Sequence, residues 1–340
     1  MSTLLPAEWA PQAAVQLTWP HADGDFGPML DAAHDQFLRL AVAIAEATPL
    51  LVVVPDRPEA RRAELLAGGV APERLQMVAL PSNDVWARDH GPITVWREDG
   101  WQHLDFRFDG WGGKFDATLD NALTAQLAEQ IRLPGMTASV DWVLEGGSIE
   151  SDGAGTILTT ARCLLDTARN PGATREGVEA LLRDQLGAQR VLWLAHGDLL
   201  GDDTDGHIDT LARFCSPDCI AYQACDDPSD AHFDTLRAMA DELGALRTAQ
   251  DKPYQLIPLP LPAAVFDPED GHRLPAGYAN FLISNALVLV PTYDDPADAI
   301  ALERLHAAFP RHRVRGVDCR TLIRQHGSLH CVTMQIPSSP

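Results

Sequence analysis

Residues 29–55, MLDAAHDQFLRLAVAIAEATPLLVVVP, place a helical pattern directly before a short apolar run. Apolar side chains between Met29 and Ala47 recur at the spacing of one helical face. The run Leu50–Val54, which lies between two prolines, has the length and composition of a buried strand. A helix followed by a buried strand is a unit of α/β folds.

The same alternation continues along the chain. Further helices are predicted over 120–131, 174–187, 230–245 and 298–310, and strands over 190–195, 254–261, 281–291 and 312–318. The segment 281–291 is expected to form two strands that break at Ser284-Asn285. No long Gly/Ser/Pro linker divides the chain, and the proline-rich stretch 253–275 is predicted to be a surface loop. We therefore expect an α/β fold in a single domain, residues 1–340.

Polar stretches marked by glycine recur after the predicted strands. They are TWPHADGD (18–25), NDVWARDHGP (83–92), LEGGSIESDG (144–153), DDTDGHIDT (202–210), GYANFL (277–282) and HGSLHCV (326–332). Most side chains suited to chemistry lie in these stretches. This pattern predicts repeated strand–turn units whose loops point to one shared centre.

The composition excludes some classes of function. Apolar residues make up 46% of the 340 residues and the formal net charge is −22. Such a charge repels nucleic acid and anionic lipid, so neither is an expected partner. The acidic balance fits a solvated surface, and it also fits a field that attracts a cationic substrate.

The sequence predicts a reduced, cytoplasmic protein. The first residues, MSTLLPAEWAPQ, have neither a basic segment nor an apolar segment typical of a signal peptide. No apolar run reaches the roughly 18 residues that a membrane span needs. Six cysteines spread over a chain of this size do not resemble a disulfide framework. The sequence does not fix the oligomeric state, and a homodimer is compatible with it.

The stretch GDDTDGHIDT (201–210) surrounds one histidine with four aspartates. If the residues from His207 onward form a strand, His207 and Asp209 share a face, and Asp205 can join them. Three interpretations stay open: a metal site, an acidic turn with a hydrogen-bonded histidine, and a carboxylate that grips a planar cation beside a general acid/base. The metal site lacks support from any EF-hand or HExxH pattern.

Two further stretches carry acidic residues. In NDVWARDHGP, Trp86 lies near Asp89, as in a pocket that binds a cation by cation–π and ion-pair contacts. The alternative is a core tryptophan beside a surface Arg88–Asp89 pair. In EGGSIESDG, Glu145 precedes two glycines, which bring the backbone close to another group.

The C-terminal stretch HGSLHCVTMQ places Cys331 beside His330. A cysteine in this setting can be a nucleophile, and the alternative is an inert buried cysteine. Cys215, Cys219 and Cys225 form no CxxC pair, so a zinc site there is weakly supported. Motifs for dinucleotide binding, phosphate cradling and serine hydrolysis are all missing from the sequence.

Taken in order, W-x-R-D-x-G-P, L-E-G-G-S, T-D-G-H-x-D and G-x-x-H-C resemble the agmatine deiminases and the wider bacterial agmatine/peptidyl-arginine deiminase family. The match runs from about residue 6 to residue 335, and the segments RNPG (169–172), YANFLISN (278–285) and AFP (308–310) agree with it. The resemblance implies a pentein fold, a pseudo-fivefold α/β propeller around a central active-site channel. The whole chain would then be one agmatine-deiminase-like catalytic domain.

The resemblance also implies roles for individual residues. Asp89 and Asp209 would grip the guanidinium nitrogens, and His207 would be the general acid/base. Glu145 would orient the guanidinium or His207, and Cys331 would be the nucleophile. The pocket would be lined by Trp86, Asn280 and Trp111.

The implied reaction is hydrolysis of a small cationic guanidino compound through an amidino-thioether on Cys331, without a metal or cofactor. Agmatine is the preferred substrate, with N-carbamoylputrescine and ammonia as products, which would be a step in putrescine and polyamine biosynthesis. Peptidyl-arginine deiminases of the family carry arginines in the region that here reads DGWGGKF (109–115), and no arginine occurs between Arg107 and Arg132. The alternatives are deimination of peptidyl-arginine or another guanidine, a non-catalytic cation-binding relative, and a metal-dependent hydrolase.

Two residues depart from the family pattern. Members usually read G-G-N-I-H-C at the nucleophile, whereas this chain reads HGSLHC. Ser328 replaces the asparagine, and His326 stands where glycine is common. A residue other than glycine at 326 is expected to affect the turn or access to Cys331.

Overall fold

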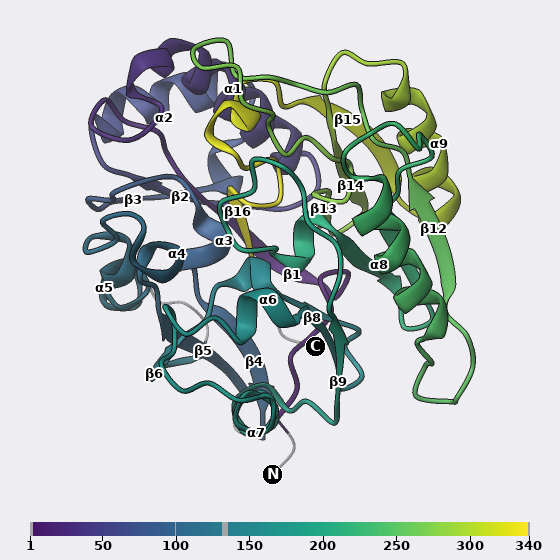
Figure 1. Ribbon diagram of the computed structural model, residues 1–340. Coiled ribbons are helices and arrows are strands. Elements are labelled where there is room, and N and C mark those ends of the chain that lie inside the picture. The colour runs from purple at the N-terminus through teal and green to yellow at the C-terminus, as the bar shows by residue number, and fades with distance from the viewer. Residues whose placement is uncertain (1–2, 99, 131–134, 339–340) are drawn as a thin grey trace.

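The computed structural model describes residues 3–98, 100–130 and 135–338. Five small β-sheets make up its framework, and the longer helices lie outside them (Figure 1). The sheets are formed by β16 (Thr333–Pro337) with β1 (Gln12–Thr18), β2 (Leu50–Val54) and β3 (Leu75–Ala79); β4 (Ile93–Arg97), β5 (Gly100–Arg107) and β6 (Met136–Val143); β7 (Ile149–Ser151), β8 (Thr156–Thr160) and β9 (Arg190–Leu194); β10 (Ala212–Ser216), β11 (Cys219–Gln223) and β12 (Gln255–Leu259); and β13 (Leu282–Ser284), β14 (Leu287–Thr292) and β15 (Arg313–Asp318).

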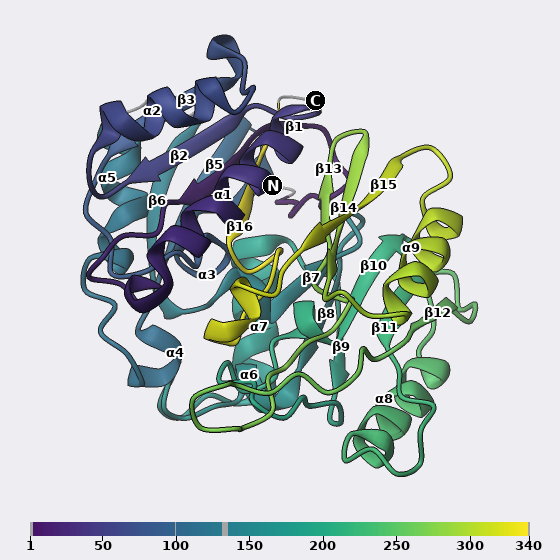
Figure 2. The same ribbon diagram turned by 90° about the horizontal axis from the view of Figure 1, so that it is seen from above.

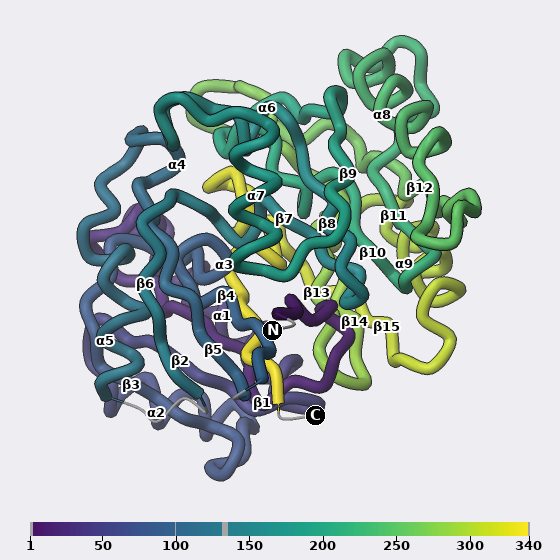
Figure 3. Tube along the Cα trace, turned by 90° about the horizontal axis from the view of Figure 1, so that it is seen from below, coloured from purple at the N-terminus to yellow at the C-terminus, as the bar shows by residue number. Residues whose placement is uncertain are grey.

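Every sheet repeats one pairing pattern. Its first strand is antiparallel to the second, and the second is parallel to the third. The first sheet closes the chain on itself, because the C-terminal β16 pairs with the N-terminal β1 (Figure 2). Seen from below, the colours of the chain follow one another around the middle of the molecule (Figure 3). The pseudo-fivefold α/β propeller implied by the resemblance is therefore confirmed.

Helices supply the crossovers between the parallel strands, as parallel pairing requires. The principal crossover helices are α1 (Leu30–Ala45), α5 (Leu123–Gln130), α7 (Arg175–Leu186), α8 (Phe233–Ala245) and α9 (Ala297–Ala308), while α2 (Pro58–Ala67) leads to the extra strand β3. In α1, Phe37, Leu40 and Ile44 are fully buried at helical spacing. They pack in one core cluster with Val52 of β2, so the opening helix–strand unit forms as predicted.

The other predicted elements are found with small shifts of their ends. The break at Asn285 is present, with a left-handed φ of 49°. Ile131, the last residue of one predicted helix, lies outside the described residues. The strand expected from His207 is wrong: Ile208–Thr210 form a 3-10 turn, and β10 starts at Ala212. His207 and Asp209 therefore do not meet on one strand face.

Five turns precede the first strand of the five sheets. They carry Asp89 before β4, Glu145 before β7, His207 and Asp209 before β10, Asn280 before β13 and Cys331 before β16. The sequence prediction of repeated units around a shared centre is thus correct in substance, although the stretch 18–25, which follows β1, has a different place in the repeat. No helix in the described part of the chain is long and apolar enough to cross a membrane.

Gly187 ends α7 with a left-handed φ of 74°, and a methyl group there would overlap the carbonyl of Thr3. We expect Gly187→Ala to lower the free energy of unfolding by about 2–3 kcal/mol, since it combines backbone strain with this overlap. Gly172→Ala is the matched control: its φ is 80°, but nothing lies near the added methyl group. Urea unfolding of both variants checks this, and equal losses would contradict it.

Candidate active site

Cys331 lies in a turn that is held by the side chain of Asn280. The Asn280 carbonyl oxygen accepts hydrogen bonds from the backbone N–H groups of His330 and Cys331, at 2.9 and 3.3 Å. Its Nδ2 lies 3.2 Å from the Cys331 sulfur. The backbone N–H of Arg88 donates to the Cys331 carbonyl at 3.1 Å, which joins this turn to the one that carries Asp89.

Asp209 is fully buried and lies beside the sulfur, with Oδ2 at 3.8 Å from Cys331 Sγ. Oδ2 also accepts a hydrogen bond from Nδ1 of His330 at 2.7 Å. Burial opposes the charged form, but the hydrogen bond and charge of His330 lower the pKa of Asp209. Its other oxygen, Oδ1, has no partner within the protein, so this carboxylate can accept one more hydrogen bond.

Asp89 is the second buried carboxylate at the site. Its Oδ1 accepts from the N–H of Gly147 at 3.1 Å, and its Oδ2 accepts from the indole of Trp111 at 3.0 Å. Burial raises the pKa of Asp89 to about 6, opposed by the charge of His207 and assisted by that of Asp209.

His207 is also fully buried, with Nδ1 3.7 Å from Asp89 Oδ1 and Nε2 4.0 Å from Glu145 Oε2. Burial opposes its charged form, yet the carboxylate of Asp89 and further neighbours raise its pKa well above the usual value. Neither ring nitrogen has a hydrogen-bond partner that satisfies it. Gly147 leaves room for the ring, because a Cβ there would stand 2.5 Å from Nδ1. The expected close approach at the paired glycines is thus present.

Glu145 is held from behind by Arg169, whose Nε donates to Oε1 at 2.7 Å. The second oxygen, Oε2, is buried without a partner and is the one nearest His207. Arg169 is itself tied to Asp205, 2.8 Å away, which bonds to Lys114 at 2.6 Å. Asp205 therefore belongs to the row of ion pairs that runs from Lys114 through Arg169 to Glu145. The expectation that it shares a strand face with His207 and Asp209 is wrong.

The cavity in front of Cys331 is lined by Asp25, Trp86, Asp89, Trp111, Phe115, Asp203, Thr204, Thr210, Gln325, His326, Gly327 and Cys331. Trp86 donates to Asp84 at 2.9 Å, and its ring packs where a side chain on Gly327 would have to stand. The alternative of a surface Arg88–Asp89 pair is wrong, since Arg88 is buried and donates to Gln335 at 2.7 Å.

The two departures from the family pattern have different surroundings. Ser328 is buried, its hydroxyl lies 3.1 Å from that of Tyr293, and it is not one of the residues that line the cavity. His326 adopts a left-handed φ of 64°, lines the cavity and stacks on His272. The turn therefore forms without glycine at 326.

Among the described residues, two buried groups of side chains could offer ligands to a metal ion, each with its ligand atoms within 4.8 Å of one another: Glu145, Cys163 and His207, and Glu8, Glu150 and His330. In both groups an arginine already contacts a carboxylate, Arg169 in the first and Arg213 in the second. A metal cation would have to enter beside that positive charge, which neither group is built to favour.

Sequence reasoning missed the residues behind the site. The sequence motifs single out His330 only as a neighbour of Cys331, and Arg169 only as part of the segment RNPG. They do not single out Glu8 or Arg213, although both are buried and ion-paired. No local pattern could have found them, because their partners lie far away in the sequence.

The surroundings of Cys331 favour the neutral thiol over the thiolate. Burial first, and then the charges of Asp209 and Asp89, raise its pKa well above the usual value. A positive charge brought between these carboxylates would offset their effect on the sulfur. A cation bound between Asp209 and Asp89 would therefore favour the thiolate of Cys331.

Comparison with known proteins agrees with this geometry. The model of the Porphyromonas-type peptidyl-arginine deiminase family matches residues 4–337. A relative in Shewanella sp. (strain MR-7), named "Putative agmatine deiminase", is 37% identical over 98% of this chain and 94% of its own. A solved structure of the "Putative Arginine Deiminase" of Porphyromonas gingivalis has a TM-score of 0.91 and 48% identity, covering 98% of both chains. Agmatine deiminase of C. jejuni with substrate bound has a TM-score of 0.92 and 33% identity, covering 99% of this chain and 97% of its own.

Fold and site together define a guanidine-modifying hydrolase with the pentein fold. More particularly, the chain belongs to the Porphyromonas-type peptidyl-arginine deiminase family, whose model covers nearly all of it.

The charge of Asp209 gives a test that needs no substrate. We expect Asp209→Asn to speed alkylation of Cys331 by the neutral reagent chloroacetamide about tenfold at pH 8, because a lower thiol pKa yields more thiolate. Mass spectrometry of the peptide that contains Cys331 gives the rate. Asp203→Asn, which alters another aspartate of the same cavity, is the control and should change little. An unchanged or slower reaction of Asp209→Asn would contradict the assignment.

Proposed function

We propose that this protein hydrolyses agmatine to N-carbamoylputrescine and ammonia through a covalent intermediate on Cys331. The observation that carries the proposal is a pair of buried carboxylate oxygens without hydrogen-bond partners, Asp209 Oδ1 and Glu145 Oε2. Buried carboxylate oxygens need hydrogen-bond donors, and a bound cation with N–H groups would supply them here. Among small cations, a guanidinium offers several N–H donors in one plane and suits carboxylate acceptors.

In this proposal Asp89 and Asp209 hold the guanidinium, and its charge offsets theirs. The Cys331 thiol then loses its proton to solvent, and the thiolate attacks the central guanidinium carbon. His207, protonated in the free enzyme, donates its proton to the departing nitrogen. The carbon–nitrogen bond breaks, and ammonia leaves an amidino-thioether on the sulfur.

Water completes the reaction. His207, now neutral, takes a proton from the water as its oxygen bonds to the carbon. The carbon–sulfur bond then breaks and returns the thiolate of Cys331. The remaining hydroxyl proton is released and converts the ammonia to ammonium, and the product carries a neutral urea group. His207 is again protonated. Glu145, fixed by Arg169, orients His207 throughout.

The choice of agmatine rests on the cavity that would receive the rest of the substrate. Its lining contains the acidic residues Asp25, Asp89 and Asp203, and neither lysine nor arginine. The nearby cations are already paired: Lys114 with Asp205, and Arg169 with Glu145. An ammonium tail suits such a cavity, whereas the carboxylate of free arginine would meet like charge.

Arginine, free or within a peptide, is the second candidate substrate. It is favoured by the family to which the chain belongs and by the 48% identity to the P. gingivalis protein named as an arginine deiminase. A peptide bond also removes the α-carboxylate charge that opposes free arginine.

The proposal is tested by incubating the protein with agmatine, free arginine and an arginyl peptide, and measuring ammonia and the urea-type product. We expect agmatine to be the best substrate by at least about tenfold in kcat/KM, given the unpaired acidic lining. Cys331→Ala should abolish turnover yet still bind agmatine in calorimetry.

Other outcomes would point elsewhere. Turnover of the peptide without turnover of agmatine would assign the second candidate. Binding of agmatine without turnover by the unaltered protein would indicate a cation-binding relative. Loss of activity on chelation, restored by added metal, would indicate a metal-dependent hydrolase.

The pKa of Asp89 predicts an acidic limit to activity. Asp89 binds a cation only when ionised, so kcat/KM for agmatine should fall as the pH drops through about 6. The hydrogen bond from Trp111 lowers this pKa. Trp111→Phe should therefore move the midpoint upward by about half a unit to one unit. Trp193→Phe, which removes an indole bonded to Glu179, is the matched control. The assignment fails if the midpoint stays in place in Trp111→Phe.

A further inference from the structure

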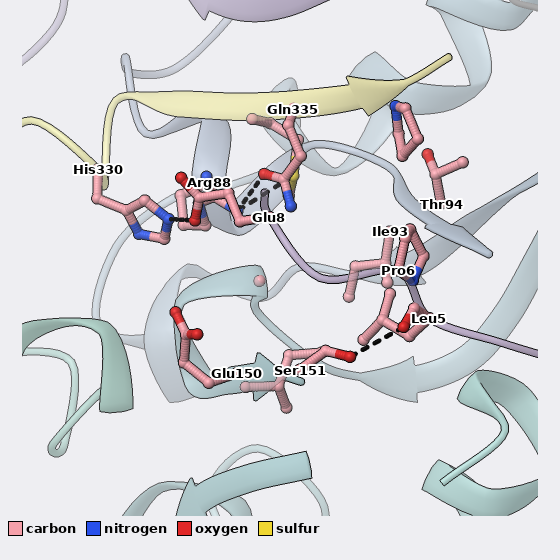
Figure 4. Close-up of a pocket in the computed structure, with 14 residues that line it drawn as sticks. Leu5, Pro6, Glu8, Arg88, Ile93, Thr94, Glu150, Ser151, His330 and Gln335 are labelled. Carbon is pink, nitrogen blue, oxygen red and sulfur yellow. Dashed lines mark hydrogen bonds and ion pairs between the residues drawn. The ribbon is translucent and has the colours of Figure 1, made fainter. Parts of the chain in front are cut away.

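A second cavity lies behind the turn that carries Cys331. It is lined in part by Glu8, Arg88, Glu150 and His330 (Figure 4). The residues that follow Arg88 and His330, namely Asp89 and Cys331, line the front cavity instead. The two turns thus form a wall, with the reacting groups on one side and charged supporting groups on the other.

The His330 ring connects the two sides of this wall. Its Nδ1 lies 2.7 Å from Asp209 Oδ2 in front, and its Nε2 lies 2.8 Å from Glu8 Oε2 behind. The dashed line between His330 and Glu8 in Figure 4 marks this second contact. Both acceptors are carboxylates, so the ring fits this place with a proton on each nitrogen.

Glu8, which accepts the hydrogen bond from His330, is itself held by two further partners. Its Oε1 accepts from the backbone N–H of Ile283 at 2.6 Å, and its Oε2 is ion-paired with Arg213. Arg213 is fully buried and also pairs with Glu150 and donates to the Phe281 carbonyl at 2.6 Å. Burial opposes the charge of Glu8, but Arg213 and His330 lower its pKa.

We propose that His330 is a positioning residue, which fixes the Asp209 carboxylate so that its free Oδ1 faces the guanidinium, and that Glu8 and Arg213 hold His330 for this purpose. The inference rests on the proposed function, since it names a further residue for the same site. His330 itself does not touch the reacting atoms in this scheme. It acts through Asp209.

The geometry gives a physical reason for this arrangement. An aspartate side chain can rotate, and only one rotation presents Oδ1 to a ligand while Oδ2 stays on the ring. Asn280 binds the backbone N–H groups of both His330 and Cys331. The ring that orients Asp209 and the sulfur that attacks are therefore fixed in one rigid turn. A preset orientation of this kind saves the ligand the cost of ordering the site.

Two substitutions at one position separate the two contacts. His330→Asn keeps an N–H donor near the place of Nδ1, so it retains the contact with Asp209 and loses that with Glu8. His330→Gln keeps a donor near the place of Nε2, so it retains the contact with Glu8 and loses that with Asp209. Ser151→Ala is the control, because Ser151 lines the same rear cavity and bonds only outside this network.

The measurement is a ratio of two alkylation rates of Cys331. Chloroacetamidine carries a planar cation like that of a guanidine, and chloroacetamide has the same shape without the charge. Their rate ratio reports how well the carboxylates hold a cation, and it cancels changes in thiol access or in the fraction of folded protein. A merely structural role for His330 would lower both rates together and leave the ratio unchanged.

We expect His330→Gln to lower the ratio about tenfold and to raise KM for agmatine more than it lowers kcat, since a hydrogen bond to a charged group is lost. His330→Asn should stay within about threefold of the unaltered protein, and Ser151→Ala should match it. An unchanged ratio in His330→Gln would overturn the inference. Equal losses in His330→Gln and His330→Asn would do so as well.

Glu8→Gln supplies a second test if His330→Gln fails to fold. It removes the charge behind the ring with little change of shape, and it should lower the ratio by about threefold. A ratio equal to that of the unaltered protein would then overturn the inference. Failure of the proposed function gives a different result: no guanidine is turned over, while the ratio still falls in His330→Gln.

Discussion

The site depends on keeping carboxylates ionised inside the protein without satisfying all of their oxygens. Asp209 and Glu145 are fully buried, and each has one oxygen bonded from behind and one without a partner. Burial of an unpaired charge is costly, so such an arrangement persists only where other charges compensate. Arg169 behind Glu145 and His330 behind Asp209 supply that compensation.

Two rows of oppositely charged side chains provide this compensation. One runs from Lys114 at the surface through Asp205 and Arg169 to Glu145, beside His207. The other runs from Glu150 through Arg213, Glu8 and His330 to Asp209. Each ends in a carboxylate whose free oxygen faces the site. Removing an interior member would leave an uncompensated buried charge, which is far more costly than losing a surface pair. The same ion pairs therefore stabilise the fold and hold the site carboxylates in place.

The α/β class was predicted from local helix and strand patterns, and the residues at the front of the site from motifs that resemble those of the family. Helical spacing around Phe37 and glycine beside Glu145 can be read from a few neighbouring residues. The back of the site could not be predicted this way. Glu8 meets Arg213 and His330 only after the first and last strands have paired, and no local pattern records such contacts. The expected strand at His207 failed for a related reason: the turn is set by tertiary contacts rather than by alternation.

The fivefold repeat explains why the reacting groups come from distant parts of the chain. Five turns, one before the first strand of each sheet, carry the candidate site residues. The turns carry different residues, and the groups that contact the carboxylates in these turns also differ. Arg169 stands behind Glu145, and His330 stands behind Asp209, whereas the indole of Trp111 bonds Asp89. Burial raises the pKa of Asp89 to about 6, whereas the hydrogen bond and charge of His330 lower that of Asp209. The groups that contact Asp89 and Asp209 therefore shift the pKa values of these two buried carboxylates in opposite directions.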